Sequence, residues 1–195
     1  MSSPREHKII VGISGASGSV YGVTLLRALR ELPNVQSHLI VSAAGYLTVT
    51  TETGLKKSEL EAMADVVHDD RNVGASIASG SFPSTAMIVA PCSMKTLGCI
   101  GQGIGGSLIT RSADVMLKER RRVILLARET PLNLAHIRNM AAVTEMGGIV
   151  YPPVPAFYSN PPDIETMVRE TVGRVMSLAG VNNELYEPWE GLGNQ

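Results

Sequence analysis

Residues 8–30 read KIIVGISGASGSVYGVTLLRALR, and this stretch decides the fold class. It begins with a nearly continuous apolar run at positions 9–13, which is typical of a strand buried on both faces. The small residues at 15–18 (GASG) follow, and they let the backbone turn sharply and approach a ligand closely. From Val20 onward apolar residues recur at helical spacing, so the pattern predicts a strand, a tight turn and a helix.

The turn in this stretch is a candidate cradle for a phosphate or a cofactor. It stands at a helix N-terminus, where unpaired N–H groups and a partial positive charge attract anions, and Ser14, Ser17 and Ser19 add hydroxyls. Its glycines are spaced differently from the G-x-G-x-x-G of dinucleotide sites, and no Lys-Ser/Thr pair of an ATP- or GTP-binding loop follows them. The alternative interpretation is a tight structural turn.

The end of the second predicted strand, residues 36–41, helps to choose the ligand. An NAD site of this kind usually carries an acidic residue there, which binds the ribose hydroxyls. The tripeptide Ser42-Ala43-Ala44 stands at this place instead. An NAD site is therefore disfavoured, and a mononucleotide such as FMN fits better.

The composition excludes several classes of protein. The 195 residues are 44% hydrophobic and 18% charged, which predicts one folded domain spanning 1–195. The formal net charge of -1 leaves no electrostatic footprint for nucleic acid or an acidic membrane surface. Cys92 and Cys99 form no C-x-x-C pair, and no apolar stretch reaches the roughly 20 residues of a membrane span. We expect a cytoplasmic protein with no metal site and with neither nucleic acid nor membrane as a partner.

Two further apolar runs, at 86–90 and 123–127, predict buried strands. Polar junctions follow them, CSMKT at 92–96 and RETP at 128–131. Because ligands bind at the carboxyl ends of strands in open parallel sheets, both junctions can face one site. Strands that alternate with helices predict an α/β protein, with a single-domain, three-layer, Rossmann-like (flavodoxin-like) fold, a parallel sheet and right-handed crossovers.

The other segments carry weaker signals. Residues 68–83 predict a long loop, in which Ser79-Gly80-Ser81 could contact a ligand. The glycines of 98–106 predict close packing against another backbone, with another subunit as one candidate. A predicted helix at 108–121 places Arg111 and Lys118 on one face. From the residues alone, Asp114 and Lys118 make a surface pair worth about 0.3 to 0.5 kcal/mol, with Arg111 solvated. A last helix covers 164–178, and the tail around Trp189 shows no motif.

Several separated motifs together resemble one family, the UbiX-type flavin prenyltransferases of the homo-oligomeric flavin-containing Cys decarboxylase superfamily. The chain looks most like members encoded with phenolic or hydroxyarylic acid decarboxylases. The motifs, in order, are GISGASG (12–18), TET (51–53), SGSF (79–82), PCSMKTL (91–97), LITRSADVMLKERR (108–121), RETPL (128–132) and PPVPAFY (152–158).

This resemblance implies a reaction and a site. The protein would transfer a dimethylallyl group from dimethylallyl monophosphate to N5 and C6 of reduced FMN, and the prenylated FMN would serve a UbiD-type aromatic acid decarboxylase. The residues that the resemblance assigns to FMN are Gly15, Ala16, Ser17, Ser42, Ser93, Met94, Lys95, Thr96 and Arg128. Those assigned to the prenyl phosphate are Arg111, Lys118, Tyr158 and Arg174, and those assigned to catalysis are Ser17, Glu52, Lys118 and Glu129. Ala43 departs from the Lys that such enzymes often carry after the serine.

The implied chemistry suits these residue types. Breaking the allylic C–O bond separates a developing carbocation from a phosphate, so fixed cations that hold the leaving group lower the barrier. Glu129 would move a proton as a general acid or base. Aromatic residues make up only 4% of the chain, so a flat ring finds few stacking partners in one subunit. The resemblance accordingly implies trimers that assemble into dodecamers, with the site shared between subunits.

Two alternative functions stay open on the sequence. One is an FMN-dependent decarboxylase of cysteine-type substrates, as in relatives of the same superfamily. Those relatives depend on a histidine base and an Asn-containing substrate motif, and neither occurs here in a matching context. The other alternative is a non-catalytic flavin-binding accessory subunit of a decarboxylase.

Overall fold

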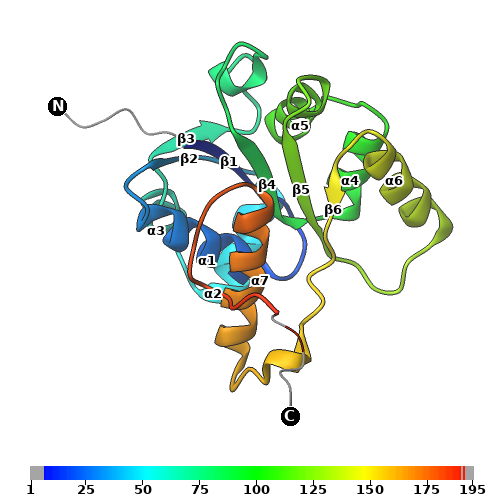
Figure 1. Ribbon diagram of the computed structural model, residues 1–195. Helices are drawn as coiled ribbons and strands as arrows, with labels where there is room; N and C mark the ends of the chain where they lie inside the picture. Colours follow the sequence, from blue (N-terminus) through cyan, green and yellow to red (C-terminus); the bar gives the residue numbers. More distant parts are fainter. Residues whose placement is uncertain (1–6, 190, 192–195) are drawn as a thin grey trace.

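The computed structural model describes residues 7–189 and 191. Its centre is a sheet of six strands in the order β3-β2-β1-β4-β5-β6 (Figure 1). All neighbouring strands pair in parallel, which confirms the predicted parallel sheet of an α/β fold. The strands are β1 His7–Ile13, β2 Val35–Val41, β3 Val66–Asp69, β4 Ala86–Cys92, β5 Arg122–Ala127 and β6 Ile149–Val150.

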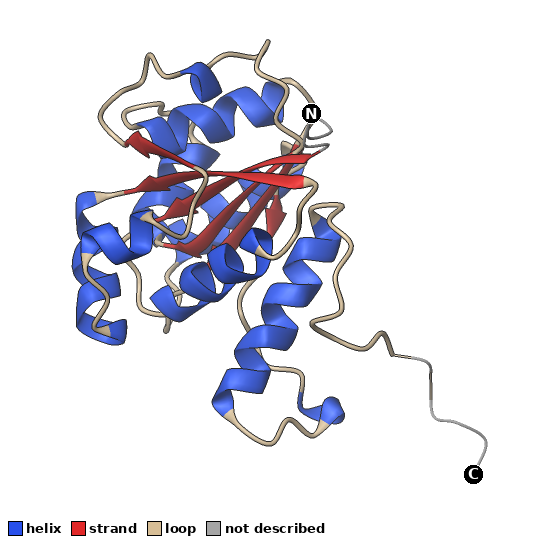
Figure 2. Ribbon diagram, turned by 90° about the vertical axis from the view of Figure 1, so that its left-hand side faces the viewer, coloured by secondary structure: helices blue, strands red, loops and turns tan. Residues whose placement is uncertain are grey.

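Helices cover both faces of this sheet, so the three predicted layers are present; Figure 2 shows the sheet between them. One layer contains α1 Ser19–Arg30, α2 Ala43–Thr53, α3 Lys57–Glu61 and α7 Ile164–Leu178. The other contains the short helix η1 Ser76–Ala78 together with α4 Met94–Gly101, α5 Leu108–Lys118 and α6 Leu134–Glu145. A second short helix, η2 Phe157–Ser159, precedes α7. The predicted domain boundaries, 1–195, include ends outside the described residues and stay a prediction.

The two layers explain why the first strand is apolar at nearly every position. Ile9, Val11 and Ile13 belong to the cluster beneath α1 and α7, whereas Ile10 belongs to the cluster beneath α4 and α5. All four side chains are 0% exposed. Since burying such a side chain contributes about 1.5 to 3 kcal/mol, the strand is anchored from both sides and its carboxyl end is held rigidly.

The strand order places a switch point beside β1. The chain proceeds from β1 to β2 and β3 on one side, and then returns to form β4 on the other side of β1. In open parallel sheets, ligands bind outside the carboxyl ends of the strands at such a point. The β1–α1 turn and the β4–α4 junction therefore flank the position where this fold places a ligand.

One strand lies partly inside the segment predicted to be a loop. β3 covers Val66–Asp69 and pairs with β2 at the edge of the sheet, and its burial alternates between half-buried and exposed. A four-residue, half-exposed edge strand carries too little apolar periodicity to be recognised in a sequence. The rest of the segment is anchored, since the Arg121 guanidinium donates to the carbonyls of Gly80 (2.8 Å) and Phe82 (2.6 Å).

The glycine-rich segment after β4 packs closely on a neighbouring backbone, as predicted, and that backbone belongs to the same subunit. A Cβ added at Gly101 would lie 3.0 Å from the carbonyl oxygen of Asn139 on α6. A Cβ at Gly98 would lie 3.1 Å from the Asn139 amide nitrogen. These two glycines let α4 and α6 approach each other.

A glycine in α1 provides a test of this packing. A Cβ at Gly22 would lie 2.3 Å from the Ala90 carbonyl oxygen and 2.9 Å from Ile13 Cδ1, so α1 lies directly on β1 and β4. Because overpacking a rigid core typically costs about 1 to 3 kcal/mol, we expect Gly22→Ala to lower the free energy of unfolding by at least about 1 kcal/mol in urea titrations. Gly106→Ala is the control, since nothing lies within 4 Å of its Cβ position. Equal stability of the two variants would contradict this packing.

Candidate active site

Ser14 ties the ends of β1 and β4 together at the switch point. Its backbone N–H donates to the Pro91 carbonyl (3.2 Å) and its hydroxyl donates to the same oxygen (3.0 Å). The hydroxyl oxygen also accepts a hydrogen bond from the backbone N–H of Ser93 (2.8 Å). Ser14 is 1% exposed, so its hydroxyl is used inside the protein and is not presented to a ligand. It fixes the turn that follows it beside the β4–α4 junction.

The turn at residues 15–18 lies directly on the N-terminus of α2. A Cβ at Gly15 would lie 2.4 Å from the Cβ of Ala44, and Gly45 passes so close to β1 that its Cβ would lie 2.5 Å from the Ile13 carbonyl oxygen. Gly15 and Ser17 are exposed. The surface beside this turn is therefore built of backbone and small side chains, which leaves room for a flat ring.

Serines cap the two helices that begin at this edge. The Ser42 hydroxyl accepts from the Gly45 N–H at the start of α2 (3.0 Å), and the Ser93 hydroxyl accepts from the Thr96 N–H at the start of α4 (3.3 Å). Ala43, which departs from the family pattern, is exposed in the first turn of α2. Two helix N-termini thus converge on the turn, and each favours negative charge.

Glu52 occupies the N-terminus of α1. Its carboxylate accepts hydrogen bonds from the backbone N–H groups of Gly18 (3.0 Å) and Ser19 (2.8 Å) and from the Ser19 hydroxyl (2.7 Å). Partial burial raises the pKa of Glu52, but hydrogen bonds from Ser17, Ser19 and these two amides outweigh it and hold the pKa below its ordinary value. From the sequence, we expected these α1 donors to bind a phosphate or a cofactor. The structure differs, because a carboxylate from α2 already satisfies them.

The remaining residues assigned to FMN lie at the same edge of the sheet. Met94, Lys95 and Thr96 form the first turn of α4. Arg128 follows β5, and its backbone N–H donates to the Cys92 carbonyl (3.1 Å) at the end of β4. Arg128 and Glu129 are both exposed, and Glu129 accepts a hydrogen bond from the Thr130 N–H (3.1 Å). The structure therefore brings together Ser17, Ser42, Ser93, Arg128 and Glu129 at one edge.

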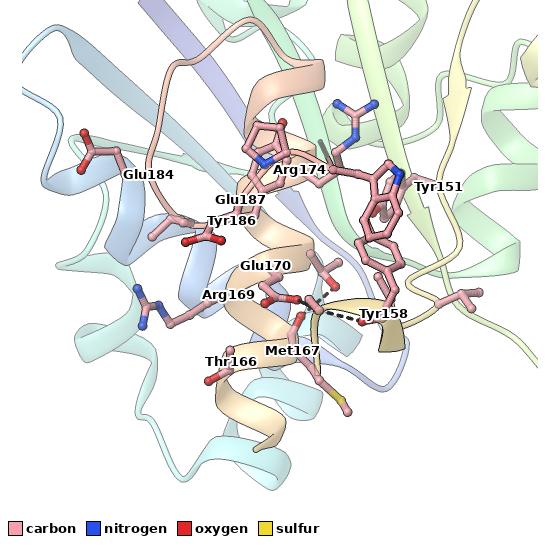
Figure 3. Close-up of a pocket in the computed structure, with 17 residues that line it drawn as sticks. Tyr151, Tyr158, Thr166, Met167, Arg169, Glu170, Arg174, Glu184, Tyr186 and Glu187 are labelled. Carbon is pink, nitrogen blue, oxygen red and sulfur yellow. Dashed lines mark hydrogen bonds between the residues drawn. The ribbon is translucent and has the colours of Figure 1, made fainter. Parts of the chain in front are cut away.

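A cavity of about 850 Å³ lies along α7 and contains two of the residues assigned to the phosphate, Tyr158 and Arg174. Tyr151, Tyr158 and Arg174 lie on one side of α7, whereas Arg169 and Glu184 extend on the other (Figure 3). The Tyr158 ring contacts the Trp189 ring edge-on, with 5.1 Å between their centroids. We name this space the α7 cavity.

Tyr151 lies between the α7 cavity and the sheet. It follows β6, and its backbone N–H donates to the Leu125 carbonyl of β5 (2.8 Å). Burial raises the pKa of Tyr151, the positive charge of Arg174 opposes this, and neighbouring phenols including that of Tyr21 add to it. Tyr21 in turn donates its backbone N–H to the Gly18 carbonyl (3.0 Å). Two tyrosines thus span the distance between the turn and the cavity.

Apart from Tyr158, sequence reasoning missed the aromatic residues of this cavity. Tyr151 follows an apolar strand and reads as core, and Tyr186 and Trp189 stand in a tail without periodicity. The one available signal was that the chain's single tryptophan lies in this short tail.

Arg111 and Lys118 lie elsewhere in the subunit. α5 covers the opposite face of the sheet from α7 and ends at Lys118, just before the amino end of β5. Arg111 pairs with Asp114 (2.8 Å) and Lys118 pairs with Glu119, so the expected Asp114–Lys118 pair is wrong. Within one subunit, the four residues assigned to the phosphate therefore form two separate groups.

Two features are absent from residues 7–189 and 191. No group of three or more His, Cys, Asp or Glu side chains is arranged to hold a metal ion in this part of the chain. No helix within it has the length and apolar character needed to cross a membrane.

Comparisons with known proteins find relatives that match nearly the whole chain. A family model described as Flavoprotein matches residues 2–178. The flavin prenyltransferase UbiX of Neisseria meningitidis serogroup B (strain ATCC BAA-335 / MC58) is 49% identical over 185 residues, which are 95% of this chain and 97% of that protein.

Two solved structures are similar over nearly the whole chain. AnUbiX (PadA1), in complex with FMN and dimethylallyl pyrophosphate, is 46% identical with a TM-score of 0.93 and covers 96% of this chain and 100% of its own. The dodecameric FMN-dependent UbiX-like decarboxylase from Escherichia coli O157:H7 is 43% identical with a TM-score of 0.91 and covers 94% and 100%, respectively.

The position of Glu52 predicts a pH-dependent contribution to stability. Folding lowers the pKa of Glu52 below its ordinary value of 4.5, so the folded state favours the carboxylate. The resulting stabilisation is complete above pH 4.5, and it disappears as the pH falls through the pKa of the folded state. We expect wild type to exceed Glu52→Gln in free energy of unfolding at pH 7, and the difference to shrink below about pH 4. Urea titrations from pH 7 to pH 3 measure this.

Glu31→Gln, at an exposed position at the other end of α1, controls for the removal of a carboxylate. A difference between wild type and Glu52→Gln that stays constant across this pH range would contradict the hydrogen-bonded carboxylate.

Proposed function

The chain belongs to the flavoprotein family and, within it, to the UbiX flavin prenyltransferases, and we propose that it transfers a dimethylallyl group from dimethylallyl monophosphate to N5 and C6 of reduced FMN. The observation that carries this proposal is the gathering of Ser17, Ser42, Ser93 and Arg128 at the switch point of the sheet. The names of the relatives favour this reaction over the decarboxylase and accessory-subunit alternatives.

The carboxyl edge of the sheet around Ser17, Ser42, Ser93 and Arg128, which we name the flavin edge, fits FMN. Gly15 and Ala16 form a surface without large side chains, and the two serine-capped helices, α2 and α4, direct their N-termini at it. Ser42, the first turn of α4 and Arg128 would hold the flavin, and Ser17 would stand beside the reactive ring nitrogen. Reduced FMN supplies the nucleophilic ring atoms N5 and C6.

The α7 cavity would bind the phosphate of the donor. Arg174 and Tyr158 line it and supply a guanidinium and a hydroxyl. When the allylic C–O bond breaks, the electron pair leaves with the phosphate, and fixed donors stabilise the negative charge that develops. Two donors are few for this task, and Arg111 and Lys118 lie too far away in the same subunit to help.

A neighbouring subunit would complete the phosphate site with its Lys118 and Arg111. The arm that carries Tyr158, formed by η2 and the beginning of α7, projects from the rest of the subunit (Figure 1), and its apolar side chains Val154, Phe157 and Ile164 are 72%, 67% and 77% exposed. A projecting apolar arm is typical of a surface that another copy covers. The relative from Escherichia coli O157:H7 is a dodecamer, which supports this arrangement.

Two carboxylates would act beside the reacting atoms, and one of them, Glu129, would move a proton. Glu129 stands exposed beside Arg128, within reach of a ligand at this edge, and would take a proton from the flavin or deliver one to the phosphate. The Ser17 hydroxyl helps to lower the pKa of Glu52, and Glu52 would hold that hydroxyl toward the ring. Lys118 would neutralise the leaving phosphate from the neighbouring subunit.

The proposal extends to the fate of the product and to the location of the protein. Prenylated FMN would pass to a UbiD-type aromatic acid decarboxylase, as the family resemblance implies. We place the protein in the cytoplasm, where reduced flavin and such a partner would be available.

Mass spectrometry of the flavin tests this function. The purified protein is incubated with reduced FMN and dimethylallyl monophosphate, and the flavin is then extracted. We expect a product whose mass exceeds that of reduced FMN by one C5H8 unit. A flavin of unchanged mass, from protein that binds FMN, would contradict the transfer and favour the accessory role.

Substitution of Glu129 by glutamine tests the proton transfer. General acid–base catalysis contributes about 10² to 10⁴ in rate, so we expect Glu129→Gln to slow single-turnover prenylation by that factor while the Kd for FMN stays unchanged. Glu145→Gln, at the exposed end of α6, is the matched control. Equal rates for Glu129→Gln and wild type would remove Glu129 from the mechanism.

A mixture of two variants tests the shared site. Lys118→Ala and Arg174→Ala each remove a charge-assisted hydrogen bond, so each alone should lose about tenfold to a hundredfold in kcat/KM. If the two residues come from different subunits, refolding both variants together regenerates intact sites in about a quarter of random pairings. Activity of the co-refolded mixture that equals the mean of the separate variants would contradict sharing.

A further inference from the structure

The segment after α7 is fastened to that helix by one side chain. The Nδ2 of Asn183 lies within hydrogen-bonding distance of the Gly173 carbonyl (3.0 Å), the Ser177 hydroxyl (3.2 Å) and the Val181 carbonyl (3.2 Å). Its Oδ1 accepts from the Leu185 N–H (3.1 Å). We name residues 181–189 the tail. A single asparagine thus joins the tail to two successive turns of α7.

The surface of α7 is shaped to receive the tail. A Cβ at Gly173 would lie 2.8 Å from Asn183 Oδ1 and 2.8 Å from Leu185 Cβ, so glycine alone lets the tail approach this closely. Gly180 reverses the chain with φ +82°, and Val181 then donates its N–H to the Met176 carbonyl (2.9 Å). Val181 is 2% exposed, which anchors the start of the tail.

The tail forms one wall of the α7 cavity. Its residues 184–189 line the same space as Tyr158 and Arg174. Trp189 contacts the Tyr158 ring at 5.1 Å between centroids. Tyr186 lies against α7, since its Cδ1 would lie 3.0 Å from a Cβ at Gly173, and it lines the cavity together with Arg174. The nearby Ser177 hydroxyl and Arg174 guanidinium lower the pKa of the Tyr186 hydroxyl. The tail therefore contacts Tyr158 and shares the cavity with Arg174, the two residues that the proposed function assigns to the phosphate.

We propose that Asn183 is a positioning residue for the phosphate site: it holds the tail on α7 so that the Tyr186 hydroxyl keeps the Arg174 guanidinium directed into the cavity. This inference rests on the proposed function. A free arginine side chain loses rotamer entropy when it binds an anion, and a partner that orients it beforehand reduces that loss. We name the hydrogen bonds of Asn183 to α7 and to the tail the clamp. Loss of the clamp therefore weakens donor binding and leaves the chemical step nearly unchanged.

Trp189 reports on the clamp directly, because it is the chain's single tryptophan and lies on the tail. In the FMN-loaded assembly, we expect Asn183→Ala to make Trp189 more accessible to acrylamide quenching. We expect KM for dimethylallyl monophosphate to rise about tenfold, with kcat within about twofold of wild type and the Kd for FMN unchanged. Asn182→Ala is the matched control, since this neighbouring asparagine is exposed and makes none of these contacts.

A second variant separates clamping from a general loss of stability. Gly173→Ala displaces the tail without altering Asn183, so it should show the same quenching and the same rise in KM. The proposal would be overturned if both variants showed the same Trp189 quenching and the same KM as wild type, with melting temperature and FMN binding retained. If either variant fails to fold, Tyr186→Phe decides, because an unchanged KM without the hydroxyl would also overturn it.

Failure of the proposed function gives a different result. Wild-type protein would then form no prenylated flavin. The clamp could still be measured by titrating inorganic phosphate and following the fluorescence of Trp189. Weaker phosphate binding and increased quenching in Asn183→Ala, with Asn182→Ala unchanged, would support the clamp. Identical titrations for all three proteins would overturn it.

Discussion

Because all six strands run parallel, the carboxyl end of every strand lies at one edge of the sheet, and the rest of the structure depends on this constraint. It brings Ser17, Ser42, Ser93 and Arg128 together from four distant parts of the sequence. It also places Lys118, at the end of a helix that leads into β5, near the opposite edge. Because these two edges lie at opposite ends of the strands, the phosphate site that we propose would take its Lys118 from a second copy.

The proposed division of the site into a flavin edge and an α7 cavity suits the reaction. Backbone and small side chains around Gly15 leave room for a flat ring, while Arg174 and Tyr158 offer donors to an anion a short distance along α7. Tyr21 and Tyr151 lie between the two parts. A donor that lay with its phosphate in the cavity would thus direct its allyl group toward the ring.

Much of the fold could be predicted from the sequence, because both-face burial leaves a continuous apolar run such as 9–13, and helices leave a clear period. β3 could not, since a short edge strand has neither signal. The flavin edge was predictable from the junctions after the strands. Two features could not be predicted. The Glu52 contact with α1 depends on a pairing between segments distant in sequence. The position of the tail on α7 depends on one side chain, Asn183, which belongs to no periodic pattern.

A structure of the assembled protein with FMN and dimethylallyl monophosphate tests most directly whether two subunits build one phosphate site. We predict that Arg174 of one subunit and Lys118 of its neighbour both lie within about 2.7 to 3.2 Å of oxygens of the same phosphate. The phosphate should lie along α7, with the allyl group toward the turn at Ser17. A phosphate bound by residues of one subunit only, with Lys118 of every copy directed into solvent, would contradict the shared site.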